Sequence, residues 1–417
     1  MRIAYLFTSF PVATETFLQR EIRAMRRRAG VEIELWSLWR GAAEWEGMPV
    51  RRYPFHRVLP VIFGKLPLWA WRRPGLLRRV WGAYMGESSP SLLNIGENLL
   101  GLGFALDTAD HFRRNPPDLF HAVWGTMPAA AAWLLHELTG VPFSMGAHAY
   151  DIFRDGGDWT LREKLARAAL VHTTTGNARA RLLELGAPPA RTRLIRRGLE
   201  PLPAWTGERP PRPPAAPLRV LSIGRLVPKK GFLRQMRIYR ALRDAGIAFE
   251  ARIVGDGPLE AELRRLAATL GIAGNVTFAG RLKFSEIPAQ HRWADVFAFT
   301  GVVADDGDRD GLPNVIPEAF AYGTPVVTTP VAGTTEAVVD GVTGQVVALE
   351  NVAGWVAALR RARDDAAFVR RTRLAARRWV EENFDARRNA DALADALANA
   401  LAAPLPTPTV LPSKGQG

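Results

Sequence analysis

The sequence contains no cysteine among its 417 residues. A disulfide framework, a thiolate metal site and a cysteine nucleophile are therefore excluded. Long apolar runs are also missing. The longest apolar stretch, 58–71, is interrupted by Lys65 and two prolines, and it is shorter than the ~18 residues that a membrane-spanning helix needs. The apolar run at 2–7 is too short for a signal peptide. These absences lead us to expect a cytoplasmic protein without spanning or targeting segments.

Acidic side chains are scarce at the start of the chain. Residues 1–80 hold 15 basic and 6 acidic residues, and they carry most of the excess in a chain whose formal net charge is +14. No acidic residue occurs from Gly47 to Gly86, where eight basic residues alternate with Trp69, Trp71 and Trp81. A polyanionic partner is implied, either nucleic acid or an anionic membrane surface.

Short apolar strands alternate with helices along most of the chain. We expect strands at 2–7, 31–38, 119–124, 143–147, 170–175, 193–197, 218–223, 249–254, 275–278, 296–300, 325–329 and 345–348. Helices are expected between them, at 16–28, 127–138, 232–245, 259–270, 314–322 and 352–363. This alternation is typical of parallel, doubly wound α/β sheets.

The domain organisation follows from one proline-rich segment. Seven prolines occur within 201–217, so this segment is expected to be extended and stiff. We predict a domain at 1–200, a linker at 201–216 and a second domain at 217–383. A helix at 384–403 is expected to pack back on the first domain, followed by a disordered tail at 404–417. The fold class is α/β, with two Rossmann-like domains facing across a cleft that holds the ligand.

The stretch 305–341 carries the strongest chemical pattern. An acidic loop ends at Asp310-Gly311, and a helix follows with Asn314 and Val315 in its first turn. Free amides and the helix dipole at such an end suit a phosphate. Glu318 lies eight residues after Asp310, so one carboxylate could bind sugar hydroxyls and the other ribose hydroxyls. Taken singly, these residues could equally form a solvated loop and helix surface.

A second pattern lies at 222–231, where a strand ends at Gly224 and a tight loop leads into a helix. Arg225 and Lys230 flank this loop, and two cations there could clamp a diphosphate leaving group. Lys229 is expected to be exposed. The alternative is a helix-capping loop with solvated cations.

A third pattern lies in the first half, where His148 follows the strand at 143–147 and Asp151 comes three residues later. Near the N-terminus, Thr14 could cap the helix at 16–28, and Glu15 would favour its positive end. Helix capping and acceptor binding are equally compatible with that pair.

Together these stretches resemble the D/E-x7-E, GR-x4-KG and H-x-x-D elements of the retaining glycosyltransferases of family 4, the group 1 glycosyltransferases, which have the GT-B fold. The S-F-P-x-x-x-E-T-F element at 9–17 and the Asp-Gly-Leu-Pro at 310–313 are similar to the colanic-acid-type, exopolysaccharide branch. The family usually has glutamate where this chain has Asp310.

The resemblance implies a hexosyl transfer from a nucleoside diphosphate sugar to a lipid-linked or growing polysaccharide. It assigns three sets of residues. The catalytic set is His148, Arg225, Lys230 and Asp310. The donor-binding set is Gly224, Gly255, Arg281, Leu282, Gly311, Asn314, Val315 and Glu318. The acceptor or positioning set is Thr14, Glu15 and Asp151. Arg197-Gly198 also resembles the family's turn before the linker.

Several alternatives remain open. Asp306 and Asp308 imitate a D-x-D metal motif, but the cationic clamp leads us to expect no metal and no cofactor. A nucleotide-sugar 2-epimerase of the same fold and a non-enzymatic basic protein are the competing functions. Because no nucleic-acid-binding motif is present, we expect no nucleic acid partner.

The basic segment 51–85 is predicted to dock on an anionic membrane surface, which would make the protein peripheral on the inner face of the cytoplasmic membrane. After Pro74-Gly75, a helix would place Leu76, Leu77, Val80, Trp81 and Tyr84 on one face and Arg78 and Arg79 on the other. That composition is typical of an interfacial helix. Alternatively, these apolar residues pack on the first sheet.

Overall fold

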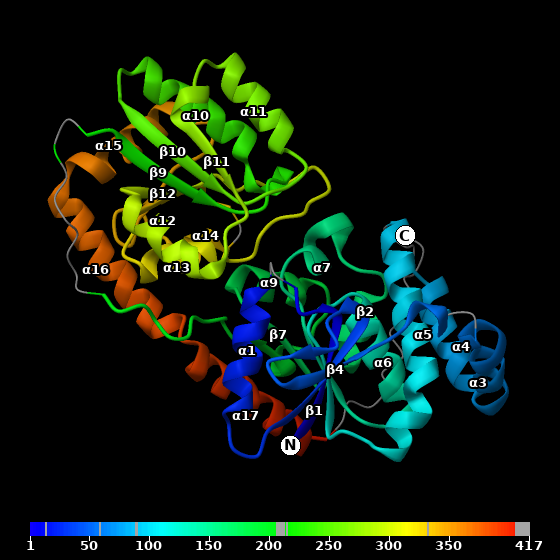
Figure 1. The fold of residues 1–417 in the computed structure, drawn as a ribbon. Helices are drawn as coiled ribbons and strands as arrows, with labels where there is room; N and C mark the ends of the chain where they lie inside the picture. The colour runs from blue at the N-terminus through cyan, green and yellow to red at the C-terminus, as the bar shows by residue number, and fades with distance from the viewer. Residues whose placement is uncertain are drawn as a thin grey trace. The chain divides into compact units, whose positions relative to one another are not determined.

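The computed structural model describes residues 1–12, 15–57, 60–87, 91–205, 213, 216–331 and 333–404. The chain forms two compact units (Figure 1). Unit 1 contains Met1–Gly198 and the segment from Ala386 onward, whereas unit 2 is the continuous segment Leu199–Asp385. Within the described ranges, no helix is both long enough and apolar enough to cross a membrane.

Unit 1 is built on a sheet with the strand order β3-β4-β2-β1-β5-β6-β7-β8. All neighbours pair in parallel except β3 and β4. The strands are β1 (Arg2–Phe10), β2 (Glu32–Gly41), β3 (Glu44–Trp45), β4 (Met48–Arg52), β5 (Leu119–Ala122), β6 (Phe143–Gly146), β7 (Leu170–Thr173) and β8 (Thr192–Leu194). The helices are α1 (Thr16–Arg26), α3 (Leu66–Arg72), α4 (Pro74–Met85), α5 (Leu92–Arg114), α6 (Met127–Thr139), α7 (Tyr150–Phe153), α8 (Leu161–Arg167), α9 (Gly176–Glu184) and α17 (Ala386–Ala402).

Successive side chains of β1 point to opposite faces of this sheet. Ala4 and Leu6 pack into the core that also contains residues of α5 and α6. Ile3, Tyr5 and Phe7 pack into the opposite core, which contains residues of α1 and α17. Because both faces are covered by helices, the central strands are buried along most of their length, which is typical of parallel sheets.

A helical segment separates β4 from β5. It contains a short π-helix, η2 (Val61–Lys65), followed by α3, α4 and the long helix α5. In Figure 1, α3 and α4 lie at the edge of unit 1, beside α5. Leu76, Val80 and Tyr84 of α4 are buried in the core with α5 and α6, and Leu77 packs against it. The prediction that these residues form an apolar face at a membrane interface is therefore wrong, because they are packed in the core. Trp81 of the same predicted face is exposed.

Unit 2 is built on a parallel sheet with the order β11-β10-β9-β12-β13-β14. The strands are β9 (Leu218–Ile223), β10 (Phe249–Val254), β11 (Val276–Gly280), β12 (Val296–Phe299), β13 (Val326–Thr328) and β14 (Gln345–Val346). The helices are α10 (Phe232–Asp244), α11 (Glu260–Thr269), α12 (Ile287–Trp293), α13 (Val315–Ala321), α14 (Thr334–Ala337), α15 (Val352–Asp364) and α16 (Ala366–Asn383). Residues of α10, α11 and α15 share one core, and residues of α12, α13 and α16 share the other.

The chain passes from unit 1 to unit 2 after Gly198 and returns after Asp385. Residues 201–205 of the expected linker belong to unit 2, where the Pro203 carbonyl accepts a hydrogen bond of 2.8 Å from Arg377. Most of the remaining linker, at 206–212 and 214–215, lies outside the described residues, as does the expected disordered tail from residue 405. The returning helix α17 packs on α1 of unit 1, and Arg28 forms an ion pair of 3.2 Å with Asp391.

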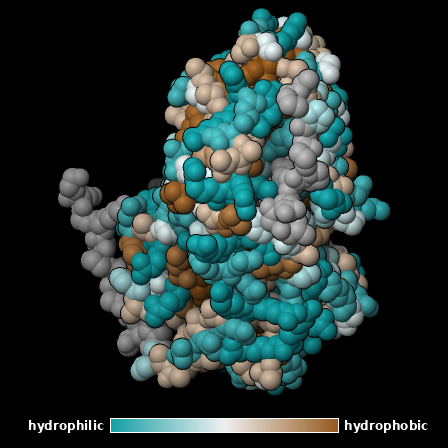
Figure 2. Space-filling view, turned by 90° about the vertical axis from the view of Figure 1, so that its left-hand side faces the viewer, coloured by the Kyte–Doolittle hydropathy of each residue, from teal (hydrophilic) through white to brown (hydrophobic). Residues whose placement is uncertain are grey.

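The space-filling view in Figure 2 shows one face of the molecule, on which hydrophilic residues predominate and apolar residues form small groups.

Candidate functional site

The loop after β9 brings two cations to the carboxyl end of the unit 2 sheet. Gly224 follows the strand directly, and its N–H donates to the Val254 carbonyl at 2.9 Å. Arg225 is exposed, whereas Lys230 is half-buried and its alkyl chain lies against Gly224. Gly231 is the N-cap of α10 and has a φ of 71°, and a Cβ there would lie 1.8 Å from the Thr300 carbonyl oxygen. Glycine is required at this position because the backbones approach so closely.

The acidic loop before α13 lies against Lys230 and its neighbour Lys229. Lys230 Nζ donates to Asp310 Oδ2 at 2.7 Å, and Lys229 Nζ lies 2.9 Å from Asp308. Lys229 is only 7% exposed, so the sequence-based expectation of an exposed lysine is wrong. Burial alone raises the pKa of Asp310, but the charges of Lys230, Lys229 and Arg225 outweigh it and hold the pKa below its usual value. Asp310 is therefore ionised at neutral pH.

The helix α13 begins beside this ion pair. Asn314 is its N-cap and Val315 its first residue, and no side-chain hydrogen bond caps this end. The first N–H groups of a helix have no acceptor within the helix, so this end can receive an anion. Glu318 is buried in the first turn. Gly311 is fixed on the other side by the Gly333 N–H, which donates to its carbonyl at 3.1 Å.

The remaining predicted donor residues lie on the loops after β10 and β11. Gly255 has a φ of 133°, and a Cβ there would lie 2.0 Å from the Gly224 carbonyl oxygen, so its loop lies directly against the cationic loop. Arg281 is exposed and forms an ion pair of 2.9 Å with Asp256, while Leu282 is half-buried. Unit 2 therefore brings the predicted donor-binding residues to one edge of its sheet.

In unit 1, a buried aspartate organises the loop that carries His148. Asp151 accepts hydrogen bonds from the backbone N–H groups of His148 at 3.0 Å, Ala149 at 2.8 Å and Gly125 at 3.1 Å. Burial raises its pKa, and these three N–H groups partly offset the rise. Asp151 thus links the loops after β5 and β6, and its contacts are with the protein's own backbone.

His148 belongs to a row of three buried histidines. The rings of His148 and His172 lie 5.2 Å apart between centroids, and those of His172 and His121 also lie 5.2 Å apart. Gly146 lies beside two of these histidines, since a Cβ there would lie 2.7 Å from His148 Nε2 and 3.0 Å from His172 Nε2. Burial, and then the charge of Arg197, hold the pKa of His148 well below its usual value. His148 is therefore neutral.

The N-terminal motif lies next to this row. Glu15 is the N-cap of α1 but makes no side-chain capping hydrogen bond, and Thr14 lies outside the described residues. The Arg197 guanidinium stacks on Phe17, with 3.3 Å between its carbon and the ring centroid, and lies 5.6 Å from the centroid of Trp124. Trp124 in turn contacts His148, with ring centroids 5.6 Å apart.

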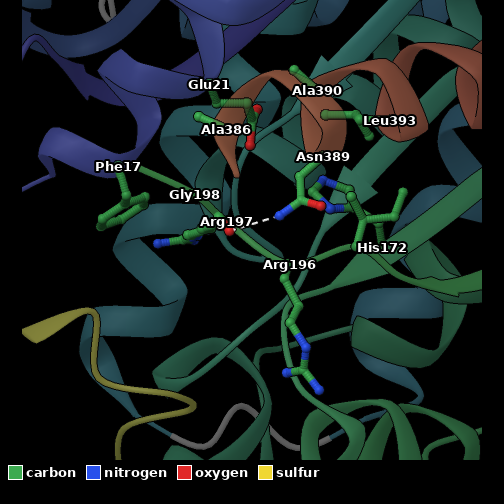
Figure 3. Close-up of a pocket in the computed structure, with 11 residues that line it drawn as sticks. Phe17, Glu21, His172, Arg196, Arg197, Gly198, Ala386, Asn389, Ala390 and Leu393 are labelled. Carbon is green, nitrogen blue, oxygen red and sulfur yellow. Dashed lines mark hydrogen bonds between the residues drawn. The ribbon is translucent and has the colours of Figure 1, made fainter. Parts of the chain in front are cut away.

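Sequence reasoning missed Glu21, which lies beside Arg197 in a small pocket of about 20 Å³ that His172 and Asn389 also line (Figure 3). Asn389 Nδ2 donates to the Arg197 carbonyl at 2.9 Å. Burial raises the pKa of Glu21 to about 7, opposed by Arg197, and burial lowers the pKa of Arg197 to about 10. The only sequence signal was a glutamate on the apolar face of a helix, because its partner Arg197 is distant in the chain.

The predicted residues thus form two sets. Glu15, His148 and Asp151 lie together in unit 1, and the cationic clamp, the acidic loop and the start of α13 lie together in unit 2. Arg225 and the uncapped start of α13, together with Lys230 if it releases Asp310, can compensate the charge of a diphosphate.

Comparison with protein families gives two matches that together span most of the chain. Residues 13–198 match the glycosyl transferase 4-like domain, and residues 208–379 match the glycosyl transferases group 1. These ranges correspond to the main segment of unit 1 and to most of unit 2.

Individual relatives agree with these matches. WcaL of Salmonella typhimurium, which carries the name of a colanic acid biosynthesis glycosyltransferase, is 29% identical over 83% of this chain and 87% of its own. A GDP-mannose-dependent phosphatidylinositol monomannoside mannosyltransferase of Mycolicibacterium smegmatis is 36% identical over 40% of this chain and 44% of its own. Among solved structures, HepE of Anabaena with UDP-glucose aligns with a TM-score of 0.68 over 96% of this chain and all of its own, at 18% identity.

Proposed function

Because this chain belongs to the group 1 glycosyltransferases and has their GT-B fold, we propose that it transfers a hexosyl unit, with retention of configuration, from a nucleoside diphosphate sugar to a lipid-linked or growing polysaccharide. The likeness to WcaL supports a polysaccharide product. The donors named for the mannosyltransferase and for HepE, GDP-mannose and UDP-glucose, support a nucleoside diphosphate as leaving group.

One observation carries this proposal: Arg225 and Lys230 lie on the loop that follows β9, and Lys230 contacts Asp310 in the loop before α13. As the bond between the sugar C1 and the phosphate oxygen breaks, negative charge develops on the diphosphate. Arg225, Lys230 and the N–H groups of Asn314 and Val315 would stabilise that charge. Lys230 would then exchange its contact with Asp310 for the diphosphate and leave Asp310 to bind the sugar.

Retention follows if the acceptor oxygen attacks C1 on the face from which the diphosphate departs. In that step the new C1–O bond forms as the old one breaks, and the acceptor proton passes to the departing phosphate oxygen. We assign the His148 backbone carbonyl to the developing positive charge at C1. Glu318 would bind the ribose hydroxyls, with Gly224, Gly255, Arg281 and Leu282 around the nucleotide.

We further propose that the reaction needs neither metal nor cofactor. Asp308 is already paired with Lys229, and the charge that a divalent cation would supply comes from the clamp. Because a lipid-linked acceptor is presented at a membrane, we place the enzyme on the inner face of the cytoplasmic membrane.

The test is a thermal-shift screen of the purified protein against UDP, GDP, ADP and their sugars. A ligand that binds only the folded protein raises its stability by mass action. The selected donor is then incubated with and without a lipid-linked glycan acceptor, and release of the nucleoside diphosphate is measured. Release that depends on acceptor supports transfer. Release without acceptor, accompanied by an altered sugar, would instead indicate an epimerase of the same fold.

A further inference from the structure

Large apolar side chains are unusually exposed on the helical segment between β4 and β5. Nine of the sixteen exposed large apolar residues in the described part of the chain fall within 62–99. They are Ile62, Phe63, Leu66, Trp71, Trp81, Met85, Leu92, Leu93 and Leu99. The exposed fraction reaches 77% for Phe63, 80% for Trp71 and 86% for Leu92. Such a concentration marks an interaction surface, since isolated exposed apolar residues are normal but clustered ones are not.

These side chains are not the unfilled part of a core, because the inner faces of the same helices are already packed. Trp69 of α3 is fully buried, and its Nε1 donates to the Leu106 carbonyl at 3.1 Å. Tyr84 of α4 is buried and donates to Asn98 at 3.0 Å. The helices therefore have a satisfied inner face and an apolar outer face.

The exposed residues follow helical stripes. On α4, Arg78, Trp81 and Met85 are spaced at i, i+3 and i+7, so they share one face away from Val80 and Tyr84. On α5, Leu92 and Leu99 are spaced at i and i+7 on the outer side of the first two turns. The side chains of Phe55 and of residues 58–59 and 88–90 lie outside the described residues, and the surface is defined without them.

Basic side chains predominate over η2, α3 and α4, whereas Glu87 follows α4 and Glu97 lies in the first turns of α5. No acidic residue occurs from Gly47 to Gly86. Lys65 and Arg72 lie within 4 Å of Asp110, and Arg79 pairs with Glu137 at 3.7 Å. Arg73 and Arg78 have no ion pair within the described residues, and both are exposed. Their positive charge beside two exposed tryptophans matches an anionic interface with an apolar interior.

We infer that η2, α3, α4 and the first turns of α5 form a docking surface for an anionic lipid bilayer. Phe63, Trp71 and Trp81 enter the boundary between head groups and acyl chains, and Arg73 and Arg78 contact lipid phosphates. This inference deepens the proposed membrane location and names the residues that contact the lipid. It differs from the sequence-based prediction, because Leu76, Val80 and Tyr84 are core residues and take no part.

The experiment is co-sedimentation of the full chain with vesicles of phosphatidylglycerol and phosphatidylcholine, against vesicles of phosphatidylcholine alone, at low and at 0.5 M salt. Each basic residue at an anionic surface contributes about a factor of five in affinity. The variant Arg73→Glu/Arg78→Glu should therefore bind anionic vesicles at least ~25-fold more weakly. The variant Phe63→Ser/Trp71→Ser/Trp81→Ser should lose the part of the vesicle binding that the parent chain retains at 0.5 M salt. These five side chains are exposed or lie outside the core, so folding should be retained.

The matched control for charge is Arg370→Glu/Arg378→Glu on exposed positions of α16, and the control for apolar loss is Phe284→Ser/Leu374→Ser in unit 2. Both should bind vesicles as the parent chain does. The inference is overturned if the parent chain ignores anionic vesicles at low salt, or if the controls lose as much binding as the variants. It is also overturned if the surface variants instead abolish self-association or binding to duplex DNA, which would make a second copy or nucleic acid the occupant. None of these outcomes depends on the donor chemistry, so the two proposals fail separately.

Discussion

Replacing Glu21 by glutamine should stabilise unit 1 above neutral pH. Glu21 lies on the inner side of α1, and burial raises its pKa from the usual 4.5 to about 7, with Arg197 opposing the rise. Between these pH values the folded protein retains a proton that the unfolded chain has released. Stability must therefore fall as the pH rises through this window and stay reduced above it. Each pH unit corresponds to ~1.4 kcal/mol, so the loss amounts to about 3 kcal/mol.

Glutamine has nearly the shape of glutamate but no charge to bury. Glu21→Gln should consequently exceed the parent chain in stability by about 3 kcal/mol at pH 8 and differ little from it near pH 4.5. Urea unfolding followed by tryptophan fluorescence is suited to the test, because most of the 13 tryptophans lie in unit 1. The control is Glu32→Gln, an exposed glutamate at the start of β2. The stability difference between Glu21→Gln and the parent chain should be larger at pH 8 than at pH 5. If it is the same at both pH values, burial does not raise the pKa of Glu21.

Three further predictions concern the donor site in unit 2. Arg225→Ala and Lys230→Ala should each lower turnover about 10²-fold, since one lost donor to developing charge costs ~2.7–4 kcal/mol; near-parental rates in both would contradict the clamp. Glu318→Ala should weaken binding of the free nucleoside diphosphate, whereas Asp310→Ala should weaken use of the sugar. Equal calorimetric losses of the bare nucleotide in both variants would refute this division. Activity should survive EDTA, and complete loss restored by Mg²⁺ or Mn²⁺ would show that the clamp needs a metal.

The alternation of strands and helices could be predicted because β5, β6 and β7 are buried on both faces and are therefore short stretches without a charged side chain, although each contains a buried polar residue. The strand at β9 and the helix at α10 were predicted within a residue or two for the same reason. The helix α5 was not predicted. Its buried residues are distributed around much of its circumference, so the sequence shows no clear period.

The site was predictable where a motif is local and hidden where it depends on distant partners. His148 and Asp151 are three residues apart, and their hydrogen bond follows directly from that spacing. The burial of Lys229 could not be foreseen, because its partner Asp308 lies on the loop after a different strand. Glu21 was missed for the same reason, since only the folded chain brings Arg197 beside it.

The return of the chain to unit 1 after Asp385 has a consequence for the order in which the protein is made. Unit 2 is continuous, so all of its strands leave the ribosome in one uninterrupted segment. Unit 1 is not, because Leu18 and Ile22 of α1 are covered by Leu393 and Leu397 of α17. During synthesis the inner face of α1 stays uncovered until the last helix emerges, although its own strands were completed much earlier. Helix α17 therefore completes the core of unit 1. A chain that terminates before α17 would leave the apolar side chains of α1 exposed on that unit.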